Sequence, residues 1–145
     1  MYTSKFNVKH DYFVNEINVK YGAFTIFKDL EVVDSFEIKS GLWGKGGLPY
    51  GLYRLMSPRV LEDTLANNSF KKEGPPWLCS MMPDFKTERF GICLHPDGGI
   101  DGTLGCMGIE RNDSKCLYIL QQIFKNKEIN FIPLLVEKYT SQEKT

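Results

Sequence analysis

The stretch 90–109 constrains the fold of this chain more than any other part of it. His95 ends an apolar run, and Cys106 follows eleven residues later. The residues between them are rich in glycine, namely Gly98, Gly99, Gly102 and Gly105. Because glycine adopts backbone conformations that are closed to other residues, the chain can double back here and bring the thiol beside the imidazole. That pairing is typical of a cysteine nucleophile with its base, and it predicts cysteine-dependent acyl transfer.

Length and charge limit what kind of protein this is. A chain of 145 residues has the size of one domain, which we expect over 1–138 with a flexible tail over 139–145. Eighteen basic residues balance eighteen acidic ones, so there is no basic field for nucleic acid or for an anionic membrane. The sequence has neither a signal-peptide pattern nor an apolar run of membrane-spanning length. We therefore expect a protein that is cytoplasmic as synthesised and binds neither nucleic acid nor membrane.

The N-terminal third has the composition of β-structure. The region 11–40 is rich in β-branched and aromatic residues, and its segments 23–27 and 32–38 predict two strands joined as a hairpin. A further strand is expected over 52–56. Because proline restricts the residue before it, Ser57-Pro58 should stop that strand.

The segments that follow are less regular, up to the run that ends at His95. The region 60–72 fits either a short helix or a loop. The apolar run 89–94 fits a buried strand that carries His95 on its end. Side chains alternate between the two faces of a strand, so Cys93 and His95 should share one face.

The clearest helix follows the glycine-rich stretch. Asp113 or Ser114 can cap it, its apolar residues recur at spacings of three and four, and it should end near Asn126. The segment 128–137 predicts a last strand, in which Pro133 favours an edge position. Together these elements predict a compact, mainly β domain, a sandwich or barrel with one or two short helices.

The predicted chemistry depends on few residues. An ordinary thiol is mostly protonated at neutral pH, so Cys106 needs a base, and His95 can supply it. Backbone amides around Leu104, Gly105 and Cys106 are candidates for stabilising an oxyanion. Thr103 or a carbonyl from 96–99 can orient the imidazole, and Asp97 is a charged candidate that we rank below an uncharged one.

Two other interpretations of these residues stay open. His95 can be a structural histidine and Cys106 a small buried thiol after a turn, since free cysteine is often buried. Alternatively, Cys93, His95, Cys106 and Cys116 can be zinc ligands, although their spacing matches no common zinc module. We expect no metal or cofactor, with all cysteines free and with Cys79 and Cys116 as core thiols.

His95 and Thr103-Leu-Gly-Cys106 resemble the motif of the L,D-transpeptidase (YkuD-like) catalytic domain, especially its short bacteriophage and effector variants. Gly47-Leu-Pro-Tyr-Gly-Leu-Tyr-Arg54 is similar to a segment that precedes that site in the family, so the resemblance spans about 40–109. It implies an L,D-transpeptidase-like β-sandwich or barrel that acts on peptidoglycan stem peptides. It also implies that Cys106 accepts the acyl group, that His95 is the base and that Gly105 belongs to the oxyanion turn.

The sequence departs from that motif at two positions. Leu104 replaces a histidine, and Gly108 replaces an arginine that is credited with holding the substrate carboxylate. An arginine from elsewhere can substitute for it, and the candidates are Arg54, Arg89 and Arg111. Our candidate substrate-binding residues are Asp97, Arg111, Trp43 and Tyr50, and Trp77 is a further aromatic candidate for a groove.

Other functions fit the same residues. A non-catalytic phage accessory module can use the same cleft to bind a peptide or glycan. Alternatively, a cysteine enzyme can act on an amide or isopeptide that is not part of the cell wall. Peptidoglycan lies beyond the membrane, so a cytoplasmic enzyme of this type would reach it by lysis, on a virion or through an injection machine. Thiol reactivity separates the enzymes from the binding module, because only an enzyme needs Cys106 ionised at neutral pH.

Overall fold

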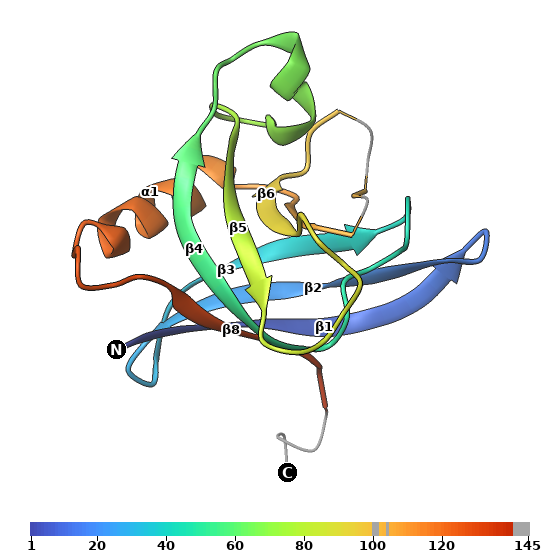
Figure 1. Ribbon diagram of the computed structural model, residues 1–145, viewed down its shortest axis with the longest axis horizontal. Coiled ribbons are helices and arrows are strands. Elements are labelled where there is room, and N and C mark those ends of the chain that lie inside the picture. Colours follow the sequence, from blue (N-terminus) through green and yellow to red (C-terminus); the bar gives the residue numbers. More distant parts are fainter. Residues whose placement is uncertain (100–101, 104, 141–145) are drawn as a thin grey trace.

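The computed structural model describes residues 1–99, 102–103 and 105–140 (Figure 1). Strands dominate it, with one α-helix and one short 3₁₀ helix. In chain order the elements are β1 (Tyr2–Val14), β2 (Ile17–Lys28), β3 (Glu31–Gly41), β4 (Gly51–Val60), η1 (Leu65–Phe70), β5 (Trp77–Pro83), β6 (Cys93–Pro96), β7 (Met107–Ile109), α1 (Asp113–Phe124) and β8 (Ile132–Lys138).

The strands close into one barrel in the order β1-β2-β3-β7-β6-β5-β4-β8. Most neighbours are antiparallel, but β8 runs parallel to β1 and β6 runs parallel to β7. The mainly β prediction is confirmed, and of the sandwich and the barrel the structure has the barrel. The contact between β3 and β7 is short, with Ile38 opposite Ile109 and Lys39 opposite Gly108.

Two of the first three strands, β2 and β3, form where the sequence predicts strands, but they are longer than predicted. β2 and β3 make the expected hairpin, with Asp29 at its turn in a left-handed conformation (φ 56°). Side chains alternate along β2, so that Phe24 and Ile26 point into the core while their neighbours are only partly covered. The strand β1 extends the β-structure back to Tyr2, and it pairs with β2 over nearly its whole length.

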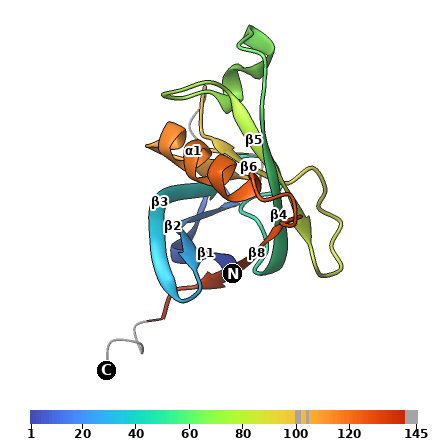
Figure 2. The ribbon, with the colours of Figure 1, turned by 90° about the vertical axis from the view of Figure 1, so that its left-hand side faces the viewer.

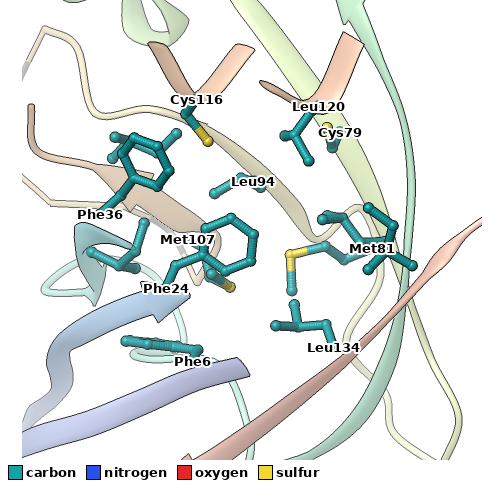
Figure 3. Packing of buried hydrophobic residues seen from close by; sticks show 14 of the residues in the cluster. Phe6, Phe24, Phe36, Cys79, Met81, Leu94, Met107, Cys116, Leu120 and Leu134 are labelled. Carbon is teal, nitrogen blue, oxygen red and sulfur yellow. The ribbon is translucent and has the colours of Figure 1, made fainter. Parts of the chain in front are cut away.

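The helix α1 covers one end of the barrel (Figure 2). Its buried side chains are Asp113, Cys116, Leu117, Leu120, Ile123 and Phe124. Figure 3 shows Cys116 and Leu120 packed above Leu94, with Met107 deeper in the same core. The helix is where the sequence predicts it, but the predicted cap is wrong: the residue at its N-cap is Asn112, and Asp113 accepts hydrogen bonds from the amides of Glu73 and Gly74 instead. Among the described residues, no helix has the length and apolar character needed to cross a membrane.

Two expectations based on proline are wrong. β4 continues through Pro58 to Val60, because its pairing with β5 shifts register between Leu55 and Pro58, and such a bulge tolerates proline. β8 is not an edge strand, since it pairs with both β1 and β4. Pro133 fits because it precedes Leu134, the first residue of β8 that pairs with β1, so the missing N–H interrupts no bond to that strand.

Two other elements differ from expectation. β5 is not predicted from the sequence, because apolar Leu78 and Met82 on its outer side hide the alternation of the buried residues. β6 begins only at Cys93, so the residues before it belong to a loop and not to the predicted strand over 89–94. The region 60–72 holds the short helix η1, one of the two forms that the sequence allows.

Candidate active site

The register of β6 and β7 assembles the site. The strands run parallel, with Leu94 opposite Met107 and His95 opposite Gly108. The same register, continued by one residue, places Cys93 beside Cys106, and their sulfur atoms are 3.5 Å apart. Leu94 and Met107 point into the core (Figure 3), so the alternating residues face the other side of the sheet. The ligand atoms of Cys93, His95 and Cys106 all lie within 4.8 Å of one another, which confirms that Cys93 and His95 share a face.

The sulfur of Cys106 lies among groups that favour its ionised form. The thiol of Cys93 lies 3.5 Å from it and can donate to it when Cys106 is ionised. The backbone amide of Cys93 donates to it at 3.3 Å, and the imidazole of His95 lies beside it. These contacts, the Cys93 thiol first, hold the pKa of Cys106 well below the ordinary thiol value, although partial burial opposes them. The same contact and burial raise the pKa of Cys93. The two shifts have opposite directions, so the contact favours a thiolate at Cys106 and a thiol at Cys93.

His95 is held in a fixed orientation. It is 5% exposed, and its Nδ1 lies 2.6 Å from the carbonyl oxygen of Pro96. A proton on Nδ1 donated to that carbonyl leaves Nε2 to exchange protons at the site. The ring of Phe70, at the end of η1, meets the imidazole edge to face at 4.8 Å between centroids. A carbonyl from 96–99 therefore orients the histidine, as the sequence allows.

Thr103 holds the chain before Cys106 rather than the imidazole of His95. Its hydroxyl donates to the carbonyl of Cys106 at 2.7 Å, and it accepts hydrogen bonds from the amides of Gly41 and Gly105. The single hydroxyl proton is used in the bond to Cys106, so it is not available to the histidine. The hydroxyl of Ser40 adds a bond to the carbonyl of Gly105 at 3.3 Å. The turn is thereby fixed to the end of β3.

Gly105 adopts a backbone conformation that disfavours any other residue. Its φ is +130°, and a Cβ there would lie 2.9 Å from the Arg89 guanidinium and 3.1 Å from the carbonyl oxygen of Gly46. Its amide donates to Thr103 at 3.2 Å, so this donor is already used in the free protein. Leu104, the other position that the sequence suggests for an oxyanion donor, lies outside the described residues.

We expect Thr103→Val to lower the free energy of unfolding by about 3 kcal/mol or more and to slow acylation of Cys106. The substitution keeps the shape of the side chain but leaves buried amides and a carbonyl without their partner, at about 1–3 kcal/mol for each unmet group. Thr103→Ser keeps the hydroxyl and is the matched control, which should stay close to the wild type. Denaturant unfolding and the rate of thiol acylation measure both effects, and equal behaviour of Val and Ser would contradict this role.

A cavity of about 640 Å³ opens beside the sulfur of Cys106. Its wall includes Cys93, His95 and Cys106. It also includes Trp43, Phe70, Arg89 and Phe90. It is of the size usual for small-molecule sites. Figure 1 shows η1 at the same end of the barrel as the chain that follows β6, and the amide of Gly98 bonds to the carbonyl of Ser69 in η1. This contact closes one side of the cavity.

The predicted substrate residues do not all reach this cavity. Trp43 lines it and is 44% exposed. Tyr50 points elsewhere, with its hydroxyl donating to Asp11, and Arg111 forms an ion pair with Glu37. Asp97 is buried next to the site, where its carboxylate accepts from the amide of Gly102. It therefore supports the loop between His95 and Cys106.

The remaining aromatic and cysteine candidates lie in the core. Trp77 is fully buried, which excludes it from a groove in this structure. Cys116 is buried on α1, so it does not join the other three residues of the zinc alternative, which lie close enough to hold an ion without it. All four cysteines are free, and Cys79 and Cys116 are core thiols as expected.

Gly108 has no room for the arginine of the resembled motif. A Cβ there would lie 2.8 Å from the Cβ of Asp97 and 2.9 Å from the Cγ2 of Thr103. The loop that carries His95 to Cys106 therefore requires glycine at this position. Arg89 is the arginine that lines the cavity, while Arg54 pairs with Asp84.

Two residues of the cavity have no signal in the sequence. Phe70 reaches His95 from η1, a segment without clear periodicity, and Phe90 lies in the loop before β6 with 90% of its surface exposed. Contacts between distant segments, such as the bond from Gly98 to Ser69 in η1, bring Phe70 to the imidazole, and such contacts leave no local pattern.

The comparisons with known proteins assign no family to this arrangement. No family model, curated protein or solved structure matches the chain.

Proposed function

We propose that this protein is a cysteine acyltransferase of the L,D-transpeptidase or L,D-carboxypeptidase type, acting on peptidoglycan stem peptides. The observation that carries the chemistry is the convergence of the Cys93 thiol, the Cys93 amide and the His95 imidazole on the sulfur of Cys106, beside an open cavity. The motif resemblance around His95 and Thr103–Cys106 supports the choice of substrate.

The reaction starts when His95 takes the proton of the Cys106 thiol, which leaves a thiolate. The sulfur attacks a substrate carbonyl carbon, a C–S bond forms, and the scissile C–N bond breaks as His95 gives its proton to the leaving amine. The product of this step is a thioester on Cys106. In the second step His95 takes a proton from an incoming amine or water, which attacks the thioester and restores the thiolate. An amine gives a crosslink or exchange, and water gives carboxypeptidase action.

Arg89 is suited to hold the terminal carboxylate of the stem peptide. Its guanidinium lines the cavity and donates to the carbonyl oxygens of Lys45, Gly46 and Gly47. A guanidinium has more N–H donors than these bonds use, and it binds carboxylates through charge-assisted hydrogen bonds. It would supply the cation that Gly108 cannot.

We expect Arg89→Gln to raise KM for a stem peptide that ends in a carboxylate by about tenfold or more, since a charge-assisted hydrogen bond contributes about 1.5–3 kcal/mol. For the same peptide with a C-terminal amide, wild type and variant should differ little. Arg89→Lys keeps the charge and should recover part of the loss. Equal increases in KM for both peptides would show that Arg89 acts only by supporting the 45–47 turn.

The test of the proposed function is digestion of purified sacculi, with the products compared by mass. We expect loss of D-alanine from tetrapeptide stems, or exchange when a free D-amino acid is added, and no change with Cys106→Ala. If Cys106 is acylated by a reactive probe but the muropeptides stay unchanged, the substrate is a different amide. If neither occurs, the cavity with its Trp43 and Phe90 walls serves binding, which is the alternative function.

A further inference from the structure

The thiol of Cys93 has no step in the acyl-transfer reaction, yet it lies 3.5 Å from the sulfur of Cys106. It is 8% exposed and lies on β6, beside the point where the chain enters β7. A cysteine that only fills the core needs no such partner. Stabilising an ionised Cys106 needs only a hydrogen-bond donor, so the presence of a second thiol at this distance calls for a separate explanation.

We propose that Cys106 is a site of reversible oxidation by hydroperoxides and that Cys93 is its resolving thiol. The thiolate of Cys106 attacks one peroxide oxygen, the O–O bond breaks, and hydroxide or an alkoxide leaves, which gives a sulfenic acid. The Cys93 sulfur then attacks the sulfur of that sulfenic acid, the S–O bond breaks, and water leaves with the proton of Cys93. The product is a Cys93–Cys106 disulfide, and a dithiol reductant restores both thiols.

The geometry allows the disulfide without rearrangement of the barrel. A disulfide needs its sulfurs about 2.05 Å apart and its Cα atoms within about 4.4–6.8 Å, which neighbouring strands provide. The sulfurs of Cys93 and Cys106 have to approach by roughly 1.5 Å, a distance that side-chain rotation supplies. Gly91 and Gly105 flank the pair on the cavity side, and the cavity gives a small peroxide access to Cys106.

The other cysteines do not compete for the oxidant. Cys79 and Cys116 are both 0% exposed, and burial raises the pKa of each thiol. A thiol that is buried and protonated reacts slowly with peroxide. Oxidation should therefore begin at Cys106, and Cys93 is the nearest thiol that can form a disulfide with it.

The disulfide has two effects on the site. It removes the nucleophile, so acyl transfer stops until a reductant acts. It also stops oxidation at a reversible stage, because a sulfenic acid without a resolving thiol proceeds to the irreversible sulfinic acid. The inference depends on the reactivity of the Cys93–Cys106 pair and not on the identity of the acyl substrate.

The test uses the full chain with stoichiometric hydrogen peroxide, followed by intact mass and peptide mapping. We expect a mass loss of about 2 Da, a peptide pair that joins Cys93 to Cys106, and full reversal by dithiothreitol. Cys93→Ser should instead gain about 32 Da under further peroxide, with the oxygens on Cys106, and resist reversal. Cys106→Ser should keep Cys93 reduced.

Other results would overturn the inference. These are sulfinic acid on Cys106 in the wild type without a disulfide, a disulfide that includes Cys79 or Cys116, or a Cys93→Ser variant that behaves as the wild type does. Sacculus digestion is read separately. If the protein forms the disulfide but leaves muropeptides unchanged, this inference stands and the proposed substrate is wrong. If it cleaves stem peptides but forms no disulfide, the proposed substrate stands and this inference is wrong.

Discussion

His95→Gln is expected to slow acylation of Cys106 by about 10²–10⁴-fold, the usual contribution of a positioned acid or base. Glutamine has similar size and polarity but neither takes up nor releases the proton that the leaving amine requires. His95 also contributes to the low pKa of the Cys106 thiol, so both formation of the thioester and its resolution should suffer. Single-turnover acylation followed by mass spectrometry measures the first step, and release of the product measures the second.

The matched control is His10→Gln. His10 is the other of the two histidines, and it is exposed on β1 with Tyr21 as its ring neighbour, so its loss should leave the rate unchanged. Thermal unfolding of both variants separates loss of the base from loss of the fold. If His95→Gln folds and acylates at the wild-type rate, His95 is structural and the proposed mechanism is wrong.

Cys93→Ala is expected to raise the pKa of Cys106 toward the ordinary thiol value of about 8.5. The Cys93 thiol is the largest of the effects that lower this pKa, and alanine removes its S–H donor while leaving the backbone amide in place. In the wild type, the rate of alkylation by iodoacetamide should stay level through neutral pH and fall only in acid. In the variant the fall should begin at clearly higher pH.

The direction of the pH dependence follows because the charged thiolate is the reactive form of Cys106. Because the folded protein lowers the pKa of Cys106, the thiolate is present above that pKa and is lost as pH falls through it. Cys116→Ala is the control, because it also removes one buried thiol but lies on α1 and does not affect the pKa of Cys106. If the two variants have the same pH profile, Cys93 does not stabilise the thiolate.

The sequence predicts the proximity of His95 and Cys106 for a sound physical reason. Glycine-rich segments can double back, and the strand period places Cys93 and His95 on one face. The sequence does not show that β6 and β7 run parallel in register, and this is what places the two sulfurs at 3.5 Å. Strand pairing depends on the whole barrel, so local patterns do not reveal it.

The errors in the predicted fold have local causes. Pro58 predicts the end of a strand because proline restricts the residue before it, but the shift of register between Leu55 and Pro58 accommodates it. Pro133 predicts an edge strand, but the pairing of β8 with β1 begins at the next residue, Leu134, so Pro133 does not prevent it. The helix α1 is predictable because its apolar residues recur with a clear period. Its cap is not predictable, because the carboxylate of Asp113 accepts hydrogen bonds from the amides of Glu73 and Gly74, which precede β5.

The residues that line the cavity are the least predictable part of the site. Aromatic and basic side chains give no information on which of them face one cavity, and Trp43 and Arg89 do so while Tyr50 and Arg111 do not. Phe70 contacts His95 only through the packing of η1 against the loop after β6. Contacts of this kind are made by tertiary structure alone.

The most direct test of the central claim, an activated acyl-accepting thiol at Cys106, is the intact mass of the protein after brief exposure to a limiting amount of a carbapenem. The account predicts a single adduct on the wild type at neutral pH that is absent from Cys106→Ala and slow to form on His95→Gln. No adduct, or equal labelling of all the cysteines, would contradict it.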